Sequence, residues 1–259
     1  MGAPVAIVAA MQEELGALLA AMPDEQRVRI AGRDFWVGHL QGQPVVAVLS
    51  RIGKVAAATT ATVLLERFGV RAIVFTGVAG GLAPGVRVGD VVVASRLLQH
   101  DLDASPIFPR YEVPLTGHAR FATDTGISDA LATVAERLLG DPVELLGQQV
   151  VDDFGLHAPR LHRGLVVSGD RFIARAADSE ALRRDLPDAL ACEMEGAAVA
   201  QVCHDYRIPF AAVRTISDRA DDAAHVDFLR FVAAVASRYS LALMNGWLGT
   251  LARAPRQSL

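Results

Sequence analysis

The sequence predicts an α/β protein in which helices cover both faces of a largely parallel central β-sheet. Short, continuous apolar runs recur along the chain, as is typical of strands that are buried on both faces. Segments with a helical period alternate with these runs, and this alternation favours a parallel sheet. No internal repeat or linker divides the 259 residues. We therefore expect a single domain over residues 1–250 and a C-terminal tail at residues 251–259.

The composition excludes several classes of protein. Hydrophobic residues make up 52% of the chain and charged residues 21%, so a disordered protein is excluded. The net charge is -4, with 25 basic against 29 acidic residues and no basic stripe, which argues against nucleic acid as a partner. No apolar run reaches the ~20 residues of a membrane span, and the start lacks the basic region of a signal peptide. With Cys192 and Cys203 interpreted as buried thiols, we expect a soluble, cytoplasmic protein.

The first elements follow from short-range patterns. Residues 5–10 are continuously apolar and predict a buried strand, and the stripe of apolar side chains over residues 11–22 predicts a helix. Residues 27–40 and 44–50 predict a hairpin whose tip lies near residues 41–43.

The next elements are punctuated by glycine and proline. The Ala- and Leu-rich residues 54–68 predict a helix, and residues 72–76 predict a buried strand that ends in the glycine-rich residues 77–81. Residues 90–95 predict a further strand. The proline-containing residues 100–117 predict a long loop, and such loops in compact domains are usually functional or disordered.

The C-terminal half continues the alternation of strands and helices. Strands are predicted at residues 164–168, 189–192 and 209–217, and helices at residues 127–139, 179–184, 196–206 and 226–248.

Three acidic residues occupy positions where a carboxylate is costly to bury. Glu14 shares the apolar stripe of its helix, Glu195 stands where a strand turns into a helix, and Asp218 follows an apolar strand. Each has an ordinary explanation, because an acid in the first turn of a helix is favoured by the dipole, and Asp218 could cap a helix or pair with Arg214. Three acids at three strand ends nevertheless favour a shared pocket, since ligands of α/β folds bind beyond the strand ends.

The glycine-rich segments and the histidines carry weaker signals. Residues 77–81 and 50–54 lack the glycine spacing of a nucleotide-binding loop, so tight turns at strand ends are expected for both. Residues 100–103, His-Asp-Leu-Asp, could suggest a metal, but the seven histidines form no set with ligand spacing. A hydrogen-bond network within the loop is the preferred interpretation, and we expect no metal or other cofactor.

Taken together, these segments resemble the bacterial 5′-methylthioadenosine/S-adenosylhomocysteine nucleosidase family. The stretches that carry the resemblance are Ala10-Met11-Gln12-Glu13-Glu14, Gly53-Lys54-Val55-Ala56-Ala57, Thr76-Gly77-Val78-Ala79-Gly80-Gly81-Leu82, Gly169-Asp170-Arg171-Phe172-Ile173, Glu193-Met194-Glu195-Gly196-Ala197-Ala198 and Arg214-Thr215-Ile216-Ser217-Asp218. The last two stretches are shared with nucleoside phosphorylases, whereas the acidic segment ending in Glu14 points to the nucleosidase branch.

The resemblance implies a single-domain phosphorylase-type fold, with a central twisted mixed β-sheet flanked by helices, and a role in methionine salvage. It implies hydrolysis of the N-glycosidic bond of these adenine nucleosides, releasing adenine and the 5′-thio-ribose. Glu14 would activate water, with Arg214 nearby, and Asp218 would protonate adenine N7 with the help of Ser217. The implied substrate-binding residues are Glu195 and Met194 at the ribose, Phe172 and Ile173 at adenine, Met11, Ile52 and Phe228 at the 5′-thio group, and Val78, Ala79, Gly80, Glu193, Ile107 and Phe108.

The chemistry of the reaction fits these roles. Cleavage develops positive charge on the ribose and negative charge on the base, so a carboxylate near the sugar and a proton donor at N7 both lower the barrier. Asp218 can donate near neutral pH only if its pKa is raised, as burial would do.

Two features depart from the family pattern. Val78 stands where the family often has serine, so a hydroxyl contact to the attacking water is missing. The loop at residues 104–110 also differs in detail. In the family this region caps the pocket of a neighbouring subunit, so we expect a homodimer, with substrate preference the property most affected.

Three alternative functions remain open. A purine nucleoside phosphorylase would need several cations around its phosphate, and the carboxylate of Glu14 would repel that phosphate. A nucleosidase for an aminodeoxyfutalosine-type substrate could use the same pocket. A nucleoside-binding protein without activity would have no need for both a base and an acid.

Overall fold

A computed structural model describes residues 2–220 and 228–253 of the chain. Its strands are β1 (Val5–Ala9), β2 (Gln26–Ile30), β3 (Arg33–Leu40), β4 (Gln43–Leu49), β5 (Ala72–Gly81), β6 (Val91–Gln99), β7 (Phe121–Ala122), β8 (Leu161–Ser168), β9 (Ala189–Glu193) and β10 (Phe210–Asp218). Its helices are α1 (Gln12–Ala20), α2 (Lys54–Phe68), α3 (Thr125–Gly140), α4 (Pro142–Leu146), α5 (Gln148–Phe154), α6 (Ala176–Asp185), α7 (Gly196–Tyr206), α8 (Phe228–Phe231) and α9 (Ser237–Arg253), with a π-helical turn at Val232–Ala236 between the last two.

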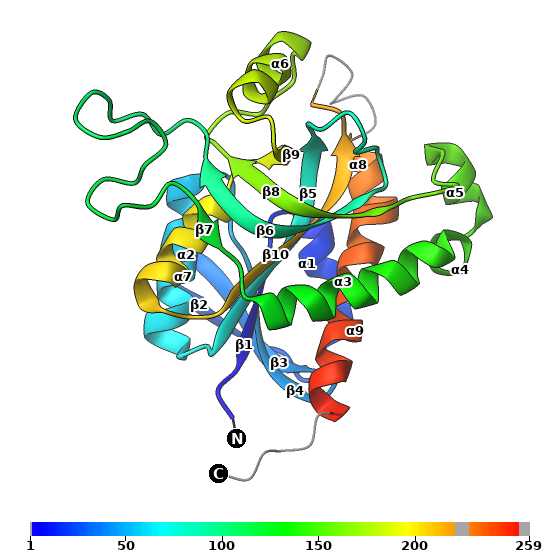
Figure 1. Cartoon of the computed structure of the whole chain (residues 1–259). Coiled ribbons are helices and arrows are strands. Elements are labelled where there is room, and N and C mark those ends of the chain that lie inside the picture. The colour runs from blue at the N-terminus through cyan, green and yellow to red at the C-terminus, as the bar shows by residue number, and fades with distance from the viewer. Residues whose placement is uncertain (1, 221–227, 254–259) are drawn as a thin grey trace.

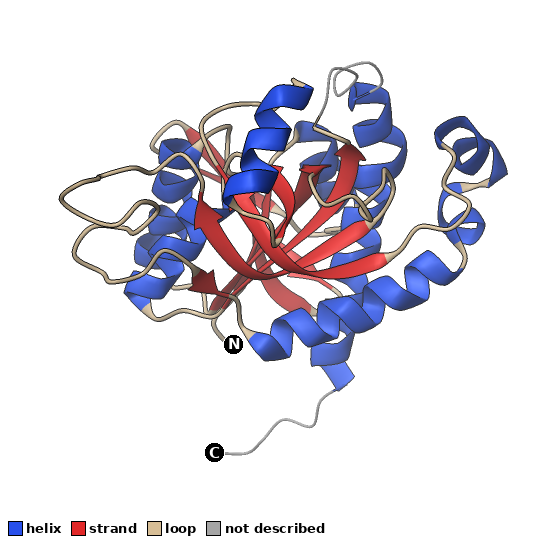
Figure 2. Cartoon of the chain, turned by 45° about the horizontal axis from the view of Figure 1, so that its top comes forward, coloured by secondary structure: helices blue, strands red, loops and turns tan. Residues whose placement is uncertain are grey.

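The strands form one mixed sheet with helices on both faces. In Figures 1 and 2, α2 and α7 lie on one side of the strands, and α1, α3 and α9 lie on the other. The strand order is β10-β6-β8-β9-β5-β1-β4-β3-β2, with β7 beside β6. Because β10 also pairs with β5, the strands β5, β10, β6, β8 and β9 close into a ring. The predicted α/β class is confirmed.

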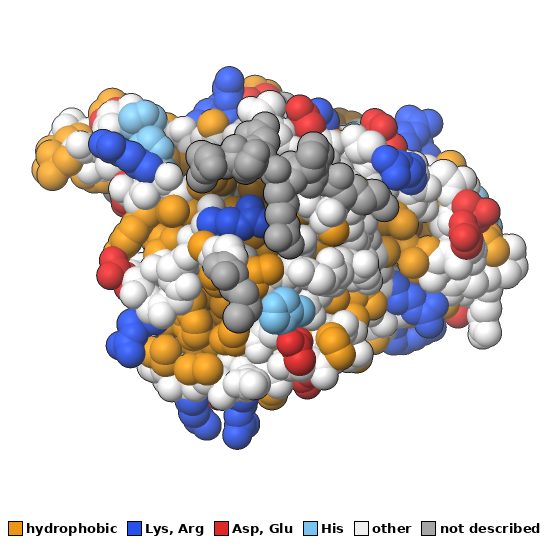
Figure 3. Space-filling view, turned by 90° about the horizontal axis from the view of Figure 1, so that it is seen from below, with side chains coloured by type: hydrophobic (Ala, Val, Ile, Leu, Met, Phe, Trp, Pro, Cys, Tyr) orange, Lys and Arg blue, Asp and Glu red, His pale blue; other side chains and the backbone are white. Residues whose placement is uncertain are grey.

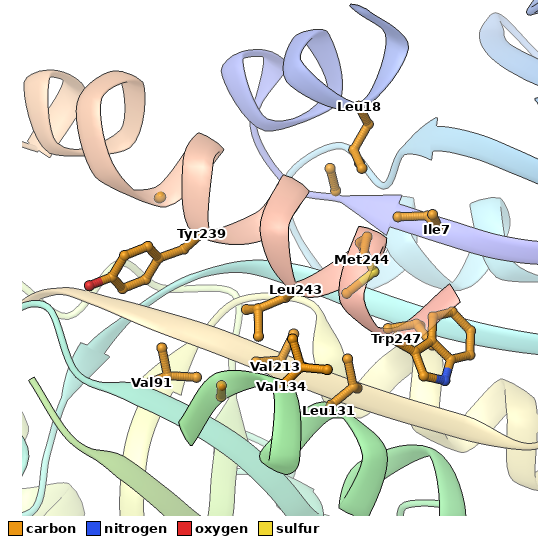
Figure 4. Packing of buried hydrophobic residues seen from close by; sticks show 14 of the residues in the cluster. Ile7, Leu18, Val91, Leu131, Val134, Val213, Tyr239, Leu243, Met244 and Trp247 are labelled. Atoms are coloured by element: carbon orange, nitrogen blue, oxygen red, sulfur yellow. The ribbon is translucent and has the colours of Figure 1, made fainter. Parts of the chain in front are cut away.

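The alternation of side chains along β1 divides the core between the two faces. Ala6 and Val8 point to the cluster formed with α2 and α7, whereas Ile7 points to the cluster formed with α1, α3 and α9. Figure 4 shows this second cluster, in which Met244 and Trp247 of α9 lie between α1 and β1 on one side and α3 and β10 on the other. Burial on both faces explains why β1 is continuously apolar.

Several predicted elements differ from the observed ones. The segment at residues 27–40 is two strands, because Ala31 and Gly32 both adopt positive φ angles and form a two-residue hairpin turn. Residues 77–81 were predicted to form a tight turn, but they continue β5, paired with β10 on one side and β9 on the other. The helices α4 and α5 were not predicted. The predicted helix at residues 226–248 is α8, the π-helical turn and α9, and its first two residues lie outside the described part of the chain.

The surface combines apolar areas with scattered charges. On the face shown in Figure 3, hydrophobic side chains form several patches separated by polar surface, and basic and acidic side chains lie among them singly or in small groups. Among the described residues, no helix combines the length and the apolar character that a membrane crossing needs.

Candidate active site

One cavity lies at the ends of β1, β8, β9 and β10, and residues from the second half of β5 also line it. It collects most of the residues that the sequence singled out, although they are spread over more than 200 positions. Its lining residues are Ala10, Met11, Ile52, Val78, Ala79, Gly80, Arg171, Phe172, Ile173, Cys192, Glu193, Met194, Glu195, Ser217, Asp218 and Phe228.

Glu14 lies in the first turn of α1, fully buried beside this cavity. One carboxylate oxygen accepts a hydrogen bond from the Met11 N–H at 3.2 Å, and the other accepts one from the Ser240 hydroxyl of α9 at 3.3 Å. Burial raises the pKa of Glu14 to about 7, although these hydrogen bonds and the charge of Arg214 act in the opposite direction. A carboxyl group with this pKa exchanges a proton readily near neutral pH, as a general base must.

Glu195 stands at the junction of β9 and α7, on the cavity wall. Its Oε1 atom accepts a hydrogen bond of 2.9 Å from the Gly53 N–H at the start of α2. Burial, and then the negative charge of Glu193, raise the pKa of Glu195 above its usual range. Because this carboxyl group lines the cavity, a polyol such as ribose could donate hydrogen bonds to its oxygens.

Glu193 is held by a dense set of donors beneath Glu195. Its carboxylate accepts hydrogen bonds from the Arg214 guanidinium at 2.8 Å, from the Ser168 hydroxyl, and from the N–H groups of Glu195 and Gly196. The Ser168 oxygen in turn accepts from the Ala197 N–H at 2.7 Å. These contacts satisfy the first N–H groups of α7, where negative charge is favoured. The Glu193 side chain therefore fixes the backbone that carries Glu195.

Arg214 is committed to this network. Its guanidinium also donates to the backbone carbonyls of Phe75 and Val213, at 2.9 and 3.1 Å, and lies over the Phe75 ring. The sequence left open a salt bridge between Arg214 and Asp218, but the partner of Arg214 is Glu193. Arg214 does not line the cavity and acts on Glu14 through its charge.

Ser217 and Asp218 end β10 at an irregularity in its pairing with β5. Ile216 pairs with Ala79 and Asp218 with Gly80, so Ser217 is the extra residue of a β-bulge. The Ser217 hydroxyl donates to Asp218 Oδ2 at 2.8 Å, and the Ala220 N–H donates to Oδ1 at 2.8 Å. The bulge brings both side chains to the cavity wall, with Asp218 directed by two donors.

Apolar side chains form the rest of the cavity wall. Phe172 and Phe228 meet edge to face, with ring centroids 6.2 Å apart, and Ile173 is buried beside them. Met11, Ile52 and Val78 complete this apolar part. Such a surface suits a flat aromatic base and a thioether.

All the predicted site residues lie on the cavity wall except Glu14, Arg214, Ile107 and Phe108. Glu14 is next to the wall, because it accepts a hydrogen bond from Met11, which lines the cavity. Ile107 and Phe108 belong to the long loop between β6 and β7. Ser240, Ser168, Arg171 and Cys192 were not predicted. Ser240 shares an apolar helix face with Tyr239, Leu243 and Trp247, so the signal that revealed Glu14 was also present there.

The described residues contain no group of three or more side chains suited to hold a metal ion. Asp101, from the segment that could have suggested a metal, instead accepts from Lys54 Nζ at 2.6 Å and from the Asp170 N–H at 2.8 Å. The predicted hydrogen-bond network of this loop is therefore present.

Comparison with known proteins shows extensive similarity. The family model of the phosphorylase superfamily matches residues 4–245. A 5′-methylthioadenosine/S-adenosylhomocysteine nucleosidase from Neisseria meningitidis, solved with methylthio-immucillin-A, is 32% identical with a TM-score of 0.84, and the match covers 96% of this chain and 100% of that chain. An S-adenosylhomocysteine nucleosidase from Streptococcus pyogenes, solved with 5-methylthiotubericidin, is 31% identical with a TM-score of 0.83, covering 97% and 98%. A 5′-methylthioadenosine/S-adenosylhomocysteine nucleosidase from S. pneumoniae, solved with a transition-state inhibitor, is 32% identical with a TM-score of 0.81, and the match covers 96% of this chain and 99% of that chain.

Proposed function

Because this chain belongs to the 5′-methylthioadenosine/S-adenosylhomocysteine nucleosidases of the phosphorylase superfamily, we propose that Glu14 and Asp218 are its catalytic base and acid. The enzyme hydrolyses the N-glycosidic bond of 5′-methylthioadenosine and S-adenosylhomocysteine. The observation that carries the assignment of roles is the pair of carboxyl groups at one cavity in different surroundings. Glu14 is fully buried with a pKa raised to about 7, and Asp218 lies at the β-bulge where the pairing between β10 and β5 ends.

The reaction uses the two acids in opposite directions. Glu14 takes a proton from water, whose oxygen bonds to C1′ of the ribose as the bond from C1′ to N9 breaks. Asp218 gives a proton to N7, so adenine leaves as a neutral molecule. Glu195 accepts hydrogen bonds from the ribose hydroxyls and opposes the positive charge that develops on the sugar. Phe172 stacks on adenine, and Met11, Ile52 and Phe228 contact the 5′-thio group.

The charges around the cavity favour water over phosphate as the nucleophile. Phosphate binding requires several cations that converge on one point. Among the described residues of the cavity wall, Arg171 is the one cation, and its guanidinium pairs with Asp178 at 3.0 Å. The Arg214 guanidinium is taken by Glu193 and two carbonyls. The buried carboxyl group of Glu14 would repel a phosphate.

The test is incubation with 5′-methylthioadenosine with and without phosphate, and with and without a chelator, followed by chromatography of the products. We expect adenine and free 5′-methylthioribose at the same rate under all conditions. A ribose 1-phosphate as the product would indicate a phosphorylase. Binding of the nucleoside without cleavage would indicate a protein that only binds it.

We also propose that the enzyme is a homodimer, and the support is its long loop between β6 and β7. Ile107 and Leu115 in this loop have 82% and 91% of their surface exposed, more than a monomer needs to leave uncovered. The loop forms the lid of the partner's pocket in a homodimer, and Ile107 and Phe108 contact the substrate there. The two free, buried thiols suit the cytoplasm as the site of action.

A further inference from the structure

Lys54, Asp101 and Asp170 come from three different segments of the chain and meet beside the cavity. Lys54 is the first residue of α2, Asp101 follows β6, and Asp170 follows β8. Lys54 Nζ donates to Asp101 Oδ1 at 2.6 Å, and the Asp170 N–H donates to Asp101 Oδ2 at 2.8 Å. The Asp170 carboxylate returns to α2, where its Oδ1 accepts from the Lys54 N–H at 2.8 Å. The three residues therefore form a closed circuit of hydrogen bonds, which we call the loop clamp.

The loop clamp supplies what the start of α2 lacks. The residue before this helix is Gly53, which has no side chain to accept from the first N–H groups. Asp170 takes the Lys54 N–H, and Glu195 takes the Gly53 N–H at 2.9 Å. The start of α2 is thus capped by two acids that follow β8 and β9, and the second of them, Glu195, is the proposed ribose ligand.

The circuit is partly shielded from water and closely packed. The side chains of Lys54 and Asp101 have 15% and 29% of their surface exposed. Burial alone would raise the pKa of Asp101, but the hydrogen bonds from Lys54 and Asp170 hold it below its usual range. A methyl group added at Gly53 would lie 3.0 Å from Asp170 Oδ1, so the two loops leave little space between them.

Each loop that the clamp joins carries a part of the proposed substrate site. Gly53 follows Ile52 on the cavity wall, and Asp170 precedes Arg171, Phe172 and Ile173, which also line it. Asp101 opens the long loop that carries Ile107. We propose that Lys54, Asp101 and Asp170 are positioning residues that hold the Gly53 N–H on Glu195 and hold Phe172 and Ile173 at the purine side of the cavity. This inference rests on the proposed function, because it assigns the clamp to the orientation of that substrate.

The test compares wild-type enzyme with Lys54→Met, Asp101→Asn and the double variant. Lys54→Met keeps the aliphatic stem without the donor, and Asp101→Asn leaves one acceptor oxygen for two donors. Since a displacement of about 1 Å can cost roughly 100-fold in rate, we expect kcat/KM for 5′-methylthioadenosine to fall by roughly 10- to 100-fold in each single variant. The double variant should be no worse than the less active single variant, because both substitutions disrupt the same unit.

Asp170 provides a matched pair of variants. Asp170→Asn keeps an oxygen that accepts from the Lys54 N–H, so we expect activity close to that of the wild type. Asp170→Ala removes this acceptor and should lose activity as Lys54→Met does. The control is Arg120→Met, which breaks a more exposed ion pair, with Asp188, away from the cavity and should leave kcat/KM unchanged. Circular dichroism and melting temperatures confirm that each variant is folded.

Additive losses in the double variant, or equal activity in Lys54→Met and Arg120→Met, would overturn the positioning role. Absence of adenine release by the wild type would overturn the proposed function instead. The clamp is then judged by the affinity for adenine in calorimetry: weaker binding in Asp170→Ala than in Asp170→Asn supports it, and equal binding overturns it.

Discussion

Glu14, Glu193, Glu195 and Asp218 lie around one cavity, yet each carboxyl group has different neighbours. Glu193 is surrounded by donors, including the Arg214 guanidinium, so its carboxyl group holds the local structure in place. Complete burial raises the pKa of Glu14, and its two hydrogen bonds lower it in part. The pKa of about 7 leaves both protonation states of Glu14 populated near neutral pH. The same side-chain chemistry therefore suits a structural role at one position and the proposed proton transfer at another.

Glu14→Gln should abolish most of the turnover and spare substrate binding. Glutamine has nearly the size of glutamate but cannot take a proton from water, and general base catalysis supplies roughly 10²- to 10⁴-fold. We expect kcat to fall by that factor, while the affinity measured by calorimetry with a substrate analogue is retained. Glu13→Gln, one position away and exposed, is the matched control. Near-wild-type turnover in Glu14→Gln would show that Glu14 is only a helix-end acid.

The same substitution should change stability in a way that depends on pH. The pKa of Glu14 is about 7 in the folded state against 4.5 as its ordinary value. Between these values the folded state binds more protons than the unfolded state, so stability falls as pH rises, by about 3 kcal/mol at most. Glu14→Gln removes this penalty and loses one hydrogen bond, worth about 1 kcal/mol. Urea unfolding should therefore show the variant to be more stable than wild type at pH 8 and less stable at pH 4, and a constant difference would contradict the shifted pKa.

Asp218→Asn should lower turnover through loss of the proton for N7. The amide oxygen still accepts from the Ala220 N–H, so the loop should keep its course. We expect kcat to fall by roughly 10²- to 10⁴-fold with 5′-methylthioadenosine. The loss should be smaller for nucleosides with a better leaving base, because these need less protonation. Equal losses across such a series would contradict the role of general acid.

The sequence revealed the individual acids but not their partners. Glu14 was predicted because a carboxylate within an apolar helical stripe is anomalous. Ser240 interrupts the apolar stripe of α9 in the same manner, and it was not predicted, although it contacts Glu14. The partner of Arg214 could not be predicted, because it depends on how β9 and β10 are placed in the sheet. The local sequence pattern indicates that a polar group is buried, but only the fold shows which group it contacts.

At the scale of elements, the small residues of β5 allow other parts of the site to pack closely against this strand. Its glycine-rich half, residues 77–81, remains in the sheet between β9 and β10. These residues were predicted to form a tight turn at the end of the strand, because they lack the glycine spacing of a nucleotide-binding loop. Their role is close approach: a Cβ atom on Gly80 would lie 2.9 Å from Asp218 Oδ1 and 3.0 Å from the Ala220 Cβ atom.

Gly80→Ala should therefore disturb Asp218 without direct removal of any functional group. The added methyl group requires the carboxylate and the Ala220 loop to shift, and a shift of about 1 Å can cost roughly 100-fold in rate. We expect a large fall in kcat with a modest change in melting temperature. Gly85→Ala, where the added atom meets nothing within 4 Å, is the control. Unchanged kcat in Gly80→Ala would show that Asp218 tolerates displacement.

Elements with strong local signals were predicted closely. The helix predicted at residues 54–68 coincides with α2, and that at residues 196–206 coincides with α7. The turn between β2 and β3 was missed because Ala31 adopts a positive φ angle, which alanine rarely does. The helices α4 and α5 are five and seven residues long, too short for a clear helical period.

At the scale of the whole molecule, the site exists because the strands close into a ring. The pairing of β10 with both β5 and β6 brings Asp218 to the segments that carry Glu14, Phe172 and Glu195. Alternation of strands and helices predicted the class of fold but contained no information on this strand order. The resemblance to a known family supplied the common site that local patterns alone could only suggest.

The assembly of the molecule is tested through the loop between β6 and β7, which projects from the body in Figure 2. Ile107→Asp places a charge where we expect an apolar contact with the partner subunit. Sedimentation velocity should show a dimer for wild type at micromolar concentration and a shift toward monomer for the variant. Its KM should rise, because the partner's pocket loses its lid, and activity per subunit should fall on dilution.

Val143→Asp is the control for this experiment, since it adds the same charge at an exposed apolar position on α4. In Figure 1, α4 lies on the opposite side of the molecule from the loop. Val143→Asp should leave both sedimentation and KM unchanged. A change in sedimentation together with a rise in KM would indicate that the partner subunit completes the substrate site, whereas a change in sedimentation alone would indicate association of two complete subunits. If Ile107 only joined two complete subunits, its substitution would separate them without raising KM. A wild-type monomer with full activity at micromolar concentration would show that each subunit closes its own pocket.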